Sequence, residues 1–122
     1  MKHILLVDDV STNLKCVSFI LKNKYKLTMV KSGREALECM ETMIPDLMLL
    51  DIRMPEMNGY EVMKHMQENP ETANIPVILL TADAGEGSKE LGMALGAVDF
   101  IRKPFEPQVL LDSIEAIWKT ED

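Results

Sequence analysis

The most informative segment for the fold is Leu47-Met48-Leu49-Leu50-Asp51, four apolar residues followed directly by a carboxylate. Two other stretches have the same form: Ile4-Leu5-Leu6-Val7 ends at Asp8-Asp9, and Val77-Ile78-Leu79-Leu80 ends at Thr81. Unbroken runs of four apolar residues are typical of strands that are buried on both faces of a parallel sheet. Weaker strands are predicted at residues 27–30 and 98–101.

Longer amphipathic segments separate these strands. Their apolar residues recur at spacings of three, four and seven, as one buried helix face requires. The five predicted faces are Leu14, Val17 and Leu21; Ala36, Leu37, Met40 and Ile44; Val62, Met63 and Met66; Leu91, Ala94 and Leu95; and Leu110, Ile114 and Ile117. Strand and helix therefore alternate five times, which predicts a doubly wound α/β fold with helices on both faces of one parallel sheet. No repeat or linker interrupts the pattern, so residues 1–122 are expected to form a single domain.

Composition narrows the function classes. The chain has 122 residues, 47% of them hydrophobic, and a formal net charge of −7, which argues against a surface that binds nucleic acid. No apolar run approaches the roughly 18 residues of a membrane span, and no signal peptide is indicated, so a cytoplasmic location is expected. Cys16 and Cys39 lack the spacing of zinc ligands and are expected to be free and mostly buried.

The strand ends carry the candidate chemistry. Ligands of open parallel sheets bind at the carboxyl ends of the strands, where Asp8, Asp9, Asp51 and Thr81 lie, with Lys103 just after the last strand. Clustered carboxylates repel one another, and a bound divalent cation relieves that repulsion. An oxygen-only ligand set indicates a hard ion, Mg²⁺ or Mn²⁺. A carboxylate can also act as a nucleophile toward phosphorus and form an aspartyl phosphate.

Each of these residues also has an ordinary structural interpretation. Asp9 could cap the first helix, and Asp51 could begin a turn. Thr81 could be a plain strand residue, and Lys103 a solvated surface lysine. These separate interpretations do not predict that all five residues stand at the same edge of the sheet.

The sequence resembles the receiver domain of two-component response regulators over essentially its whole length. The matching segments are residues 5–9, 51–59, 80–82 and 96–105, which include Leu5-Leu6-Val7-Asp8-Asp9, Leu80-Thr81-Ala82 and the Lys103-Pro104-Phe105 end of the last segment. The resemblance implies a flavodoxin-like three-layer sandwich with strand order 2-1-3-4-5. It also implies a signalling module that is not an enzyme in its own right and that takes a phosphoryl group from a phosphohistidine.

The resemblance assigns a role to each site residue. Asp51 would be the phospho-acceptor, and Asp8, Asp9, Asp51 and the Arg53 backbone carbonyl would bind Mg²⁺. Thr81 and Lys103 would bind the phosphoryl group, with Lys103 paired to Asp51 before the group arrives. The remaining implied residues are Phe100 as a switch aromatic, a cis peptide at Lys103-Pro104, and Arg53, Ala82 and Asp83 flanking the site.

The resemblance also implies a switch and partners. As Thr81 moves toward the phosphoryl group, the ring of Phe100 would turn inward and change the surface of the fourth helix, fifth strand and fifth helix. The expected partners are a sensor histidine kinase or phosphotransfer protein and a downstream protein or output domain, with a homodimer through the same surface as a further possibility. Arg53 and Asp83 could pair across the mouth of the site and limit the access of water.

Three other classes fit the sequence less well. A haloacid-dehalogenase-type phosphatase needs a second acid two positions after its nucleophile, where this chain has Arg53. A flavodoxin-like cofactor binder needs phosphate-binding donors after the first strand, where this chain has Asp8-Asp9. A receiver-like module that never takes phosphate would not need all five site residues.

Overall fold

Strands and helices alternate along the part of the chain that the structure describes. The structure, a computed structural model, describes residues 1–82, 85 and 87–119. The strands are β1 (His3–Val7), β2 (Lys26–Val30), β3 (Leu47–Leu50), β4 (Val77–Thr81) and β5 (Asp99–Arg102). The helices are α1 (Ser11–Leu21), α2 (Gly33–Cys39), α3 (Gly59–Glu68), α4 (Ser88–Ala94) and α5 (Pro107–Trp118).

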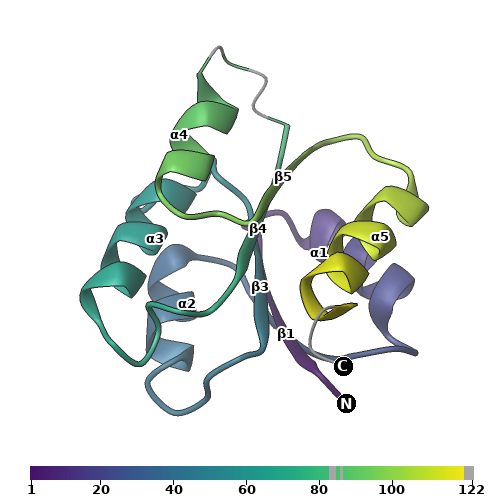
Figure 1. Cartoon of the computed structure of the whole chain (residues 1–122), viewed down its shortest axis with the longest axis horizontal. Helices are drawn as coiled ribbons and strands as arrows, with labels where there is room; N and C mark the ends of the chain where they lie inside the picture. The colour runs from purple at the N-terminus through teal and green to yellow at the C-terminus, as the bar shows by residue number, and fades with distance from the viewer. Residues whose placement is uncertain (83–84, 86, 120–122) are drawn as a thin grey trace.

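All five strands form one parallel sheet in the order β2-β1-β3-β4-β5. Helices α2, α3 and α4 cover one face, and α1 and α5 cover the other (Figure 1). This confirms the doubly wound three-layer fold and the strand order that the resemblance implies. The register pairs Val7 with Leu50 and Leu50 with Leu79, so that the central strands end close together.

A hydrophobic core fills each side of the sheet, because successive strand residues point to opposite faces. Leu5, Val7, Met48, Leu50 and Leu79 pack beneath α2 and α3. Their neighbours Ile4, Leu6, Leu47, Leu49 and Ile78 pack beneath α1 and α5. The apolar runs of the central strands are therefore buried on both faces, as their sequence predicted.

Two predicted helix faces differ from the structure. Ile44 does not belong to a helix, because α2 ends at Cys39 with Met40 as its C-cap, and the Ile44 side chain is exposed. In α4 the buried residue is Gly92, whereas Leu91 is 46% exposed. The fifth strand begins at Asp99, one residue later than predicted, because Asp99 is the residue that pairs with Ile78.

The cysteines also differ from expectation. Cys16 is exposed, because Leu14, Val17 and Leu21 are the residues of α1 that face the core, and Cys39 is only partly buried. Both thiols are free, as expected. Among the described helices, none combines the length and apolar character that crossing a membrane requires.

Candidate phosphoryl and metal site

Strand pairing fixes the backbone of the candidate site. Asp8 and Asp51 directly follow β1 and β3, and the Asp51 N–H donates a hydrogen bond of 2.9 Å to the Val7 carbonyl. On the other side, Thr81 ends β4, and its carbonyl accepts a 2.9 Å hydrogen bond from the Lys103 N–H. Two pairs of residues that lie far apart in the sequence are thereby brought to one edge of the sheet.

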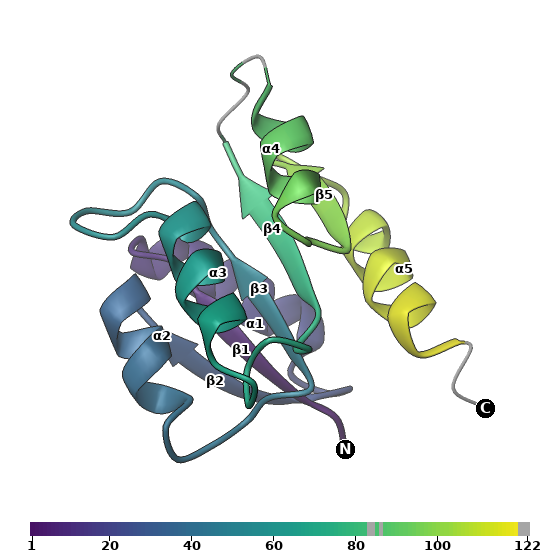
Figure 2. The same cartoon turned by 60° about the vertical axis from the view of Figure 1, so that its left-hand side comes forward.

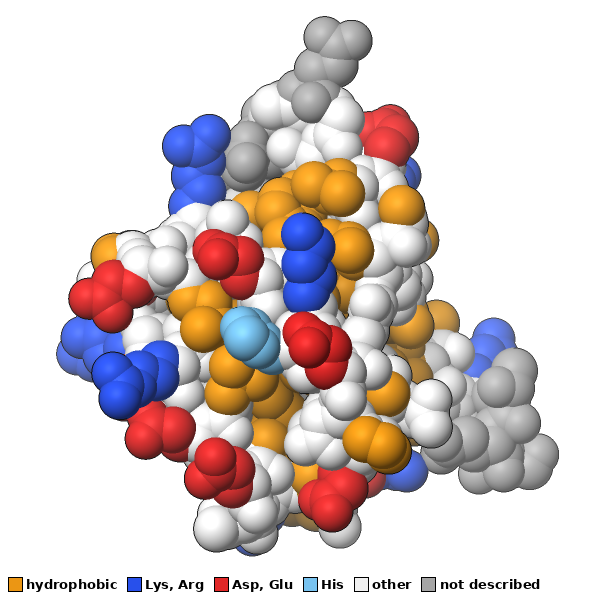
Figure 3. Space-filling view, turned by 90° about the vertical axis from the view of Figure 1, so that its left-hand side faces the viewer, with side chains coloured by type: hydrophobic (Ala, Val, Ile, Leu, Met, Phe, Trp, Pro, Cys, Tyr) orange, Lys and Arg blue, Asp and Glu red, His pale blue; other side chains and the backbone are white. Residues whose placement is uncertain are grey.

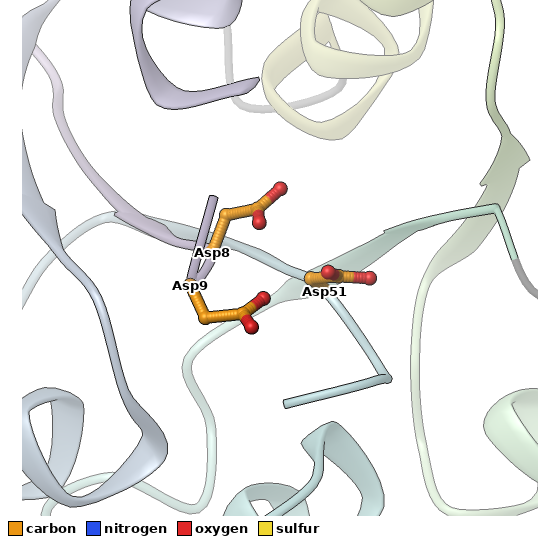
Figure 4. A group of neighbouring side chains, drawn as sticks. All are labelled: Asp8, Asp9 and Asp51. Atoms are coloured by element: carbon orange, nitrogen blue, oxygen red, sulfur yellow. The ribbon is translucent and has the colours of Figure 1, made fainter. Parts of the chain in front are cut away.

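The carboxylates of Asp8, Asp9 and Asp51 form a compact cluster. Each offers an oxygen atom, and the three oxygens lie within 4.8 Å of one another. Figure 4 shows the Asp9 side chain directed toward Asp51, with Asp8 beside Asp9. Asp8 and Asp51 are buried and Asp9 is partly buried. An all-oxygen set of this kind fits Mg²⁺, which prefers carboxylates and usually keeps several water ligands.

The cluster opens into a cleft of about 540 Å³. The cleft is lined by Asp9, Val10, Asn13, Asp51, Arg53, Thr81, Ala82, Gly85 and Lys103. Asp51, Thr81 and Lys103 therefore line the same space, as the sequence predicted. The exposed Arg53 and Ala82 stand at its margin, whereas Asp83 lies outside the described residues.

Lys103 has a different partner from the one expected. Its Nζ atom lies 2.7 Å from Asp8 Oδ2, and the ion pair that the structure gives Lys103 joins it to Asp8 and not to Asp51. Both side chains are largely buried. The position of the Lys103 backbone determines which carboxylate of the cluster its ammonium can reach. In this structure that carboxylate is Asp8.

The electrostatics of the site act most strongly on Asp51. Burial raises the pKa of the Asp51 carboxyl above its ordinary value, and the nearby Asp8 carboxylate raises it further. The Lys103 ammonium and hydrogen bonds from Ile52 and Thr81 act in the opposite direction on the same pKa. Ionised Asp51 is therefore held in an unfavourable environment that a bound cation would improve.

The start of α1 contributes a residue that the sequence analysis missed. Asn13 lines the cleft, although it was not among the predicted site residues. The available signal was its position in the first turn of the helix that follows Asp9. Asp9 is not the helix cap that one interpretation made it: the N-cap is Val10, whose N–H donates to Asp8 Oδ1 at 2.9 Å.

The loop between β3 and α3 holds the other wall of the site. Asn58 and Glu61 form a reciprocal capping box that starts α3. The Gly59 N–H donates to the Ile52 carbonyl at 2.8 Å, and a Cβ atom at Gly59 would lie 2.5 Å from the Asp51 carbonyl oxygen. The first residue of α3 can therefore sit against the backbone of Asp51 only because it is a glycine.

The resemblance also implied a cis peptide and a switch aromatic. The Lys103–Pro104 peptide bond is cis, as the resemblance implied. The residue Phe100 is 8% exposed and belongs to the core beneath α2 and α3. The ring that was expected to turn inward on phosphorylation is thus already inside in this structure.

Known proteins have sequences similar to that of this chain. The sequence model of the response regulator receiver domain matches residues 4–115. A protein named a probable cyclic di-GMP phosphodiesterase, from Vibrio cholerae, is 46% identical over 101 residues, which are 83% of this chain and 23% of that protein. The response regulator SaeR of Staphylococcus aureus is 39% identical over 112 residues, which are 91% of this chain and 48% of that protein. The chain thus spans about half or less of the length of these relatives.

Solved structures give the same result. The signal receiver domain of a histidine kinase from Syntrophus aciditrophicus superposes with a TM-score of 0.89 at 33% identity, covering 98% of this chain and 91% of that one. The receiver domain of the sensor histidine kinase PA1611 from Pseudomonas aeruginosa has a TM-score of 0.86 at 29% identity, covering 94% and 95%, and has magnesium coordinated in its active-site cleft. The match to the family model, the sequence identity to known response regulators and the similarity in fold agree. This chain belongs to the response regulator receiver domain family.

Proposed function

We propose that the chain is a phosphorylation switch in which Asp51 accepts a phosphoryl group from a phosphohistidine of a sensor kinase or phosphotransfer protein. The observation that carries this proposal is that Asp51 belongs to a cluster of three carboxylates and lines one cleft with the hydroxyl-bearing Thr81 and the ammonium-bearing Lys103. Receiver domains act in two-component signalling, which sets the class of donor.

The proposed step has a simple balance. A carboxylate oxygen of Asp51 forms a bond to phosphorus, while the bond from phosphorus to the donor imidazole nitrogen breaks and its electron pair returns to that nitrogen. Mg²⁺ held by Asp8, Asp9, Asp51 and the Arg53 carbonyl would supply positive charge to the phosphoryl oxygens. Lys103 would add a second positive charge, and the Thr81 hydroxyl would donate a hydrogen bond to the bound group.

Charge supports this division of roles. Three carboxylates without a cation would repel an anionic donor, so phosphorylation should require the metal. Lys103 is already drawn into the cluster by Asp8, at 2.7 Å, and is thus close to the place where phosphoryl charge would appear. The chain would act only on its own Asp51, without a separate substrate to turn over.

The consequence of phosphorylation would be a change in surface. Thr81 and Phe100 would link the phosphoryl group to the surface of α4, β5 and α5, where a downstream protein, an output domain or a second copy of the chain would bind. Residues 1–122 would act together as one receiver unit.

The test is phosphorylation with acetyl phosphate, followed by intact mass. We expect the mass of one phosphoryl group to appear only with Mg²⁺ and to be absent in Asp51→Asn. Asp112→Asn, which changes an exposed aspartate on α5, serves as the matched control and should be labelled like the wild type. Labelling that persists in Asp51→Asn would show that another residue is the acceptor.

A further inference from the structure

Helix α3 holds both ends of helix α4 through side chains. The Tyr60 hydroxyl donates a 2.9 Å hydrogen bond to the carbonyl of Ser88, the first residue of α4. The Gln67 carboxamide donates to the carbonyl of Leu95, the C-cap of α4. Donors and acceptors are both seven residues apart, so each pair lies on one side of its helix, two turns apart. Figure 2 shows the two helices lying next to each other.

Among the described residues of α4, none has a buried side chain. The helix has seven residues, its N-cap Gly87 makes no side-chain hydrogen bond, and its buried residue is Gly92, which has no side chain. Leu91 and Met93 are 46% and 41% exposed. A helix this short is not stable by itself and depends on contacts with the rest of the protein. The space-filling view shows apolar side chains gathered at the surface on this side of the molecule (Figure 3).

Gly92 brings α4 close to the core behind the phospho-acceptor site. A Cβ atom at Gly92 would lie 2.5 Å from Leu79 Cδ1, 3.6 Å from the Phe100 ring and 3.8 Å from the Tyr60 ring. The backbone of α4 therefore lies directly against Phe100. Leu79 and Phe100 are paired across β4 and β5, and Thr81 follows Leu79 by two residues on the same strand.

We infer that Tyr60 and Gln67 are positioning residues that hold α4 over Phe100 and thereby set how readily Asp51 is phosphorylated. These two hydrogen bonds form an α3–α4 clamp. The inference deepens the proposed function, because it names a regulatory contact of the same site.

The direction of the effect follows from the position of the ring. With the clamp formed, Phe100 is inside, which is the arrangement that the proposed switch assigns to the phosphorylated protein. Breaking the clamp lets α4 move away from the Phe100 ring. The loss of the clamp therefore favours the arrangement in which the ring is turned outward. Because coupling between two sites is reciprocal, loss of the clamp weakens binding of a phosphoryl group, and binding of that group strengthens the clamp.

The first experiment needs no phosphorylation. Amide hydrogen–deuterium exchange of residues 88–95 is measured by mass spectrometry in metal-free wild type, Tyr60→Phe, Gln67→Met and the double variant. Each substitution keeps most of the side chain and removes the donor. We expect faster exchange in all three variants, most in the double variant. Tyr25→Phe and Gln108→Met are the matched controls, since Tyr25 packs on Trp118 and Gln108 lies on α5.

The second experiment measures the effect on the site. Beryllofluoride with Mg²⁺ serves as the phosphoryl mimic, and its affinity is measured by calorimetry. One net hydrogen bond corresponds to about a two- to tenfold change in an equilibrium, so Tyr60→Phe is expected to weaken binding by up to about that factor and the double variant by more. Gln67→Met alone is expected to have the smaller effect, because Gln67 is exposed. The two controls should bind like the wild type.

The outcomes separate the inference from the proposed function. Unchanged exchange at residues 88–95 in the double variant would refute the clamp. Faster exchange with unchanged or tighter beryllofluoride binding would refute its coupling to Asp51. If the wild type binds no beryllofluoride while the exchange result holds, the proposed phosphorylation fails and the coupling with it, but the clamp itself stands.

Discussion

The ammonium of Lys103 lies 2.7 Å from Asp8 Oδ2, which joins residues 95 positions apart in the sequence across the acidic cluster. In the metal-free protein Lys103 supplies the positive charge that the three carboxylates require. A bound Mg²⁺ would take over that role. The ion pair and the metal therefore compete for the same carboxylates.

Lys103→Met is expected to lower stability and to raise Mg²⁺ affinity. Removing one partner leaves Asp8 buried and charged without compensation, which costs about 3 kcal/mol in the free energy of unfolding without metal. The variant should bind Mg²⁺ several-fold more tightly, because no ammonium repels the ion. Urea unfolding in EDTA and calorimetric titration measure the two effects. Lys64→Met, at an exposed position on α3, is the control. Equal Mg²⁺ affinity in wild type and Lys103→Met would contradict the competition.

Asp51→Asn is expected to stabilise the metal-free protein at neutral pH. Burial and Asp8 raise the pKa of Asp51 in the folded state, so the folded protein holds the Asp51 proton more tightly than the unfolded chain does. The contribution of Asp51 to stability is thus complete below its unfolded pKa and is lost as the pH rises through the folded pKa. Asparagine removes the penalty that remains at pH 7.

This effect can be measured by thermal unfolding in EDTA at pH 7 and near pH 4. The gain in Tm from Asp51→Asn should be larger at pH 7 and should shrink at the lower pH. Excess Mg²⁺ at pH 7 should also reduce it, because the cation stabilises the wild-type carboxylates and not the amide. A gain that is the same at both pH values would exclude ionisation of Asp51 as its cause.

Gly59→Ala is expected to be costly, more so than Gly33→Ala. Each glycine is the first residue of its helix, after the caps Asn58 and Ser32. At Gly59 a Cβ atom would lie 2.5 Å from the Asp51 carbonyl oxygen and 3.0 Å from Ile52 Cα, both of which are backbone atoms. At Gly33 the nearest atom is Val62 Cγ2, the end of a side chain. We expect about 2–3 kcal/mol for Gly59→Ala and less for Gly33→Ala in urea unfolding. The reverse order would contradict the backbone contact.

Glu56→Gly is expected to be more stable than Glu56→Ala. Glu56 has a φ of 68°, which lies in the left-handed region that is unfavourable for residues with a Cβ atom. Glycine relieves that strain, at an entropic cost in the unfolded chain, so a net difference of about 0.5–1 kcal/mol in favour of glycine over alanine is expected. The paired urea curves measure it. Alanine equal to or better than glycine would mean that the loop changes conformation instead of bearing strain.

Local sequence patterns predicted most of the fold. The runs at residues 4–7, 47–50 and 77–80 lie in strands. A strand whose residues do not alternate between apolar and polar is typically buried on both faces of a sheet. Position at the strand ends also predicted that Asp51, Thr81 and Lys103 line one cleft. The same reasoning failed for Ile44 and Leu91, because apolar spacing alone does not reveal where a helix ends or that a glycine makes the close contact.

Residue types and their spacing predicted the order of strands and helices, the edge of the sheet where the acidic residues lie, and the kind of ion that they suit. Those properties depend on residue type and on spacing within one element. Three contacts became visible only in the folded chain: Lys103 pairs with Asp8, Asn13 reaches the cleft, and Tyr60 and Gln67 bind the two ends of α4. These contacts join residues from different elements, and the packing angle and register of those elements, which no local pattern encodes, set which atoms meet.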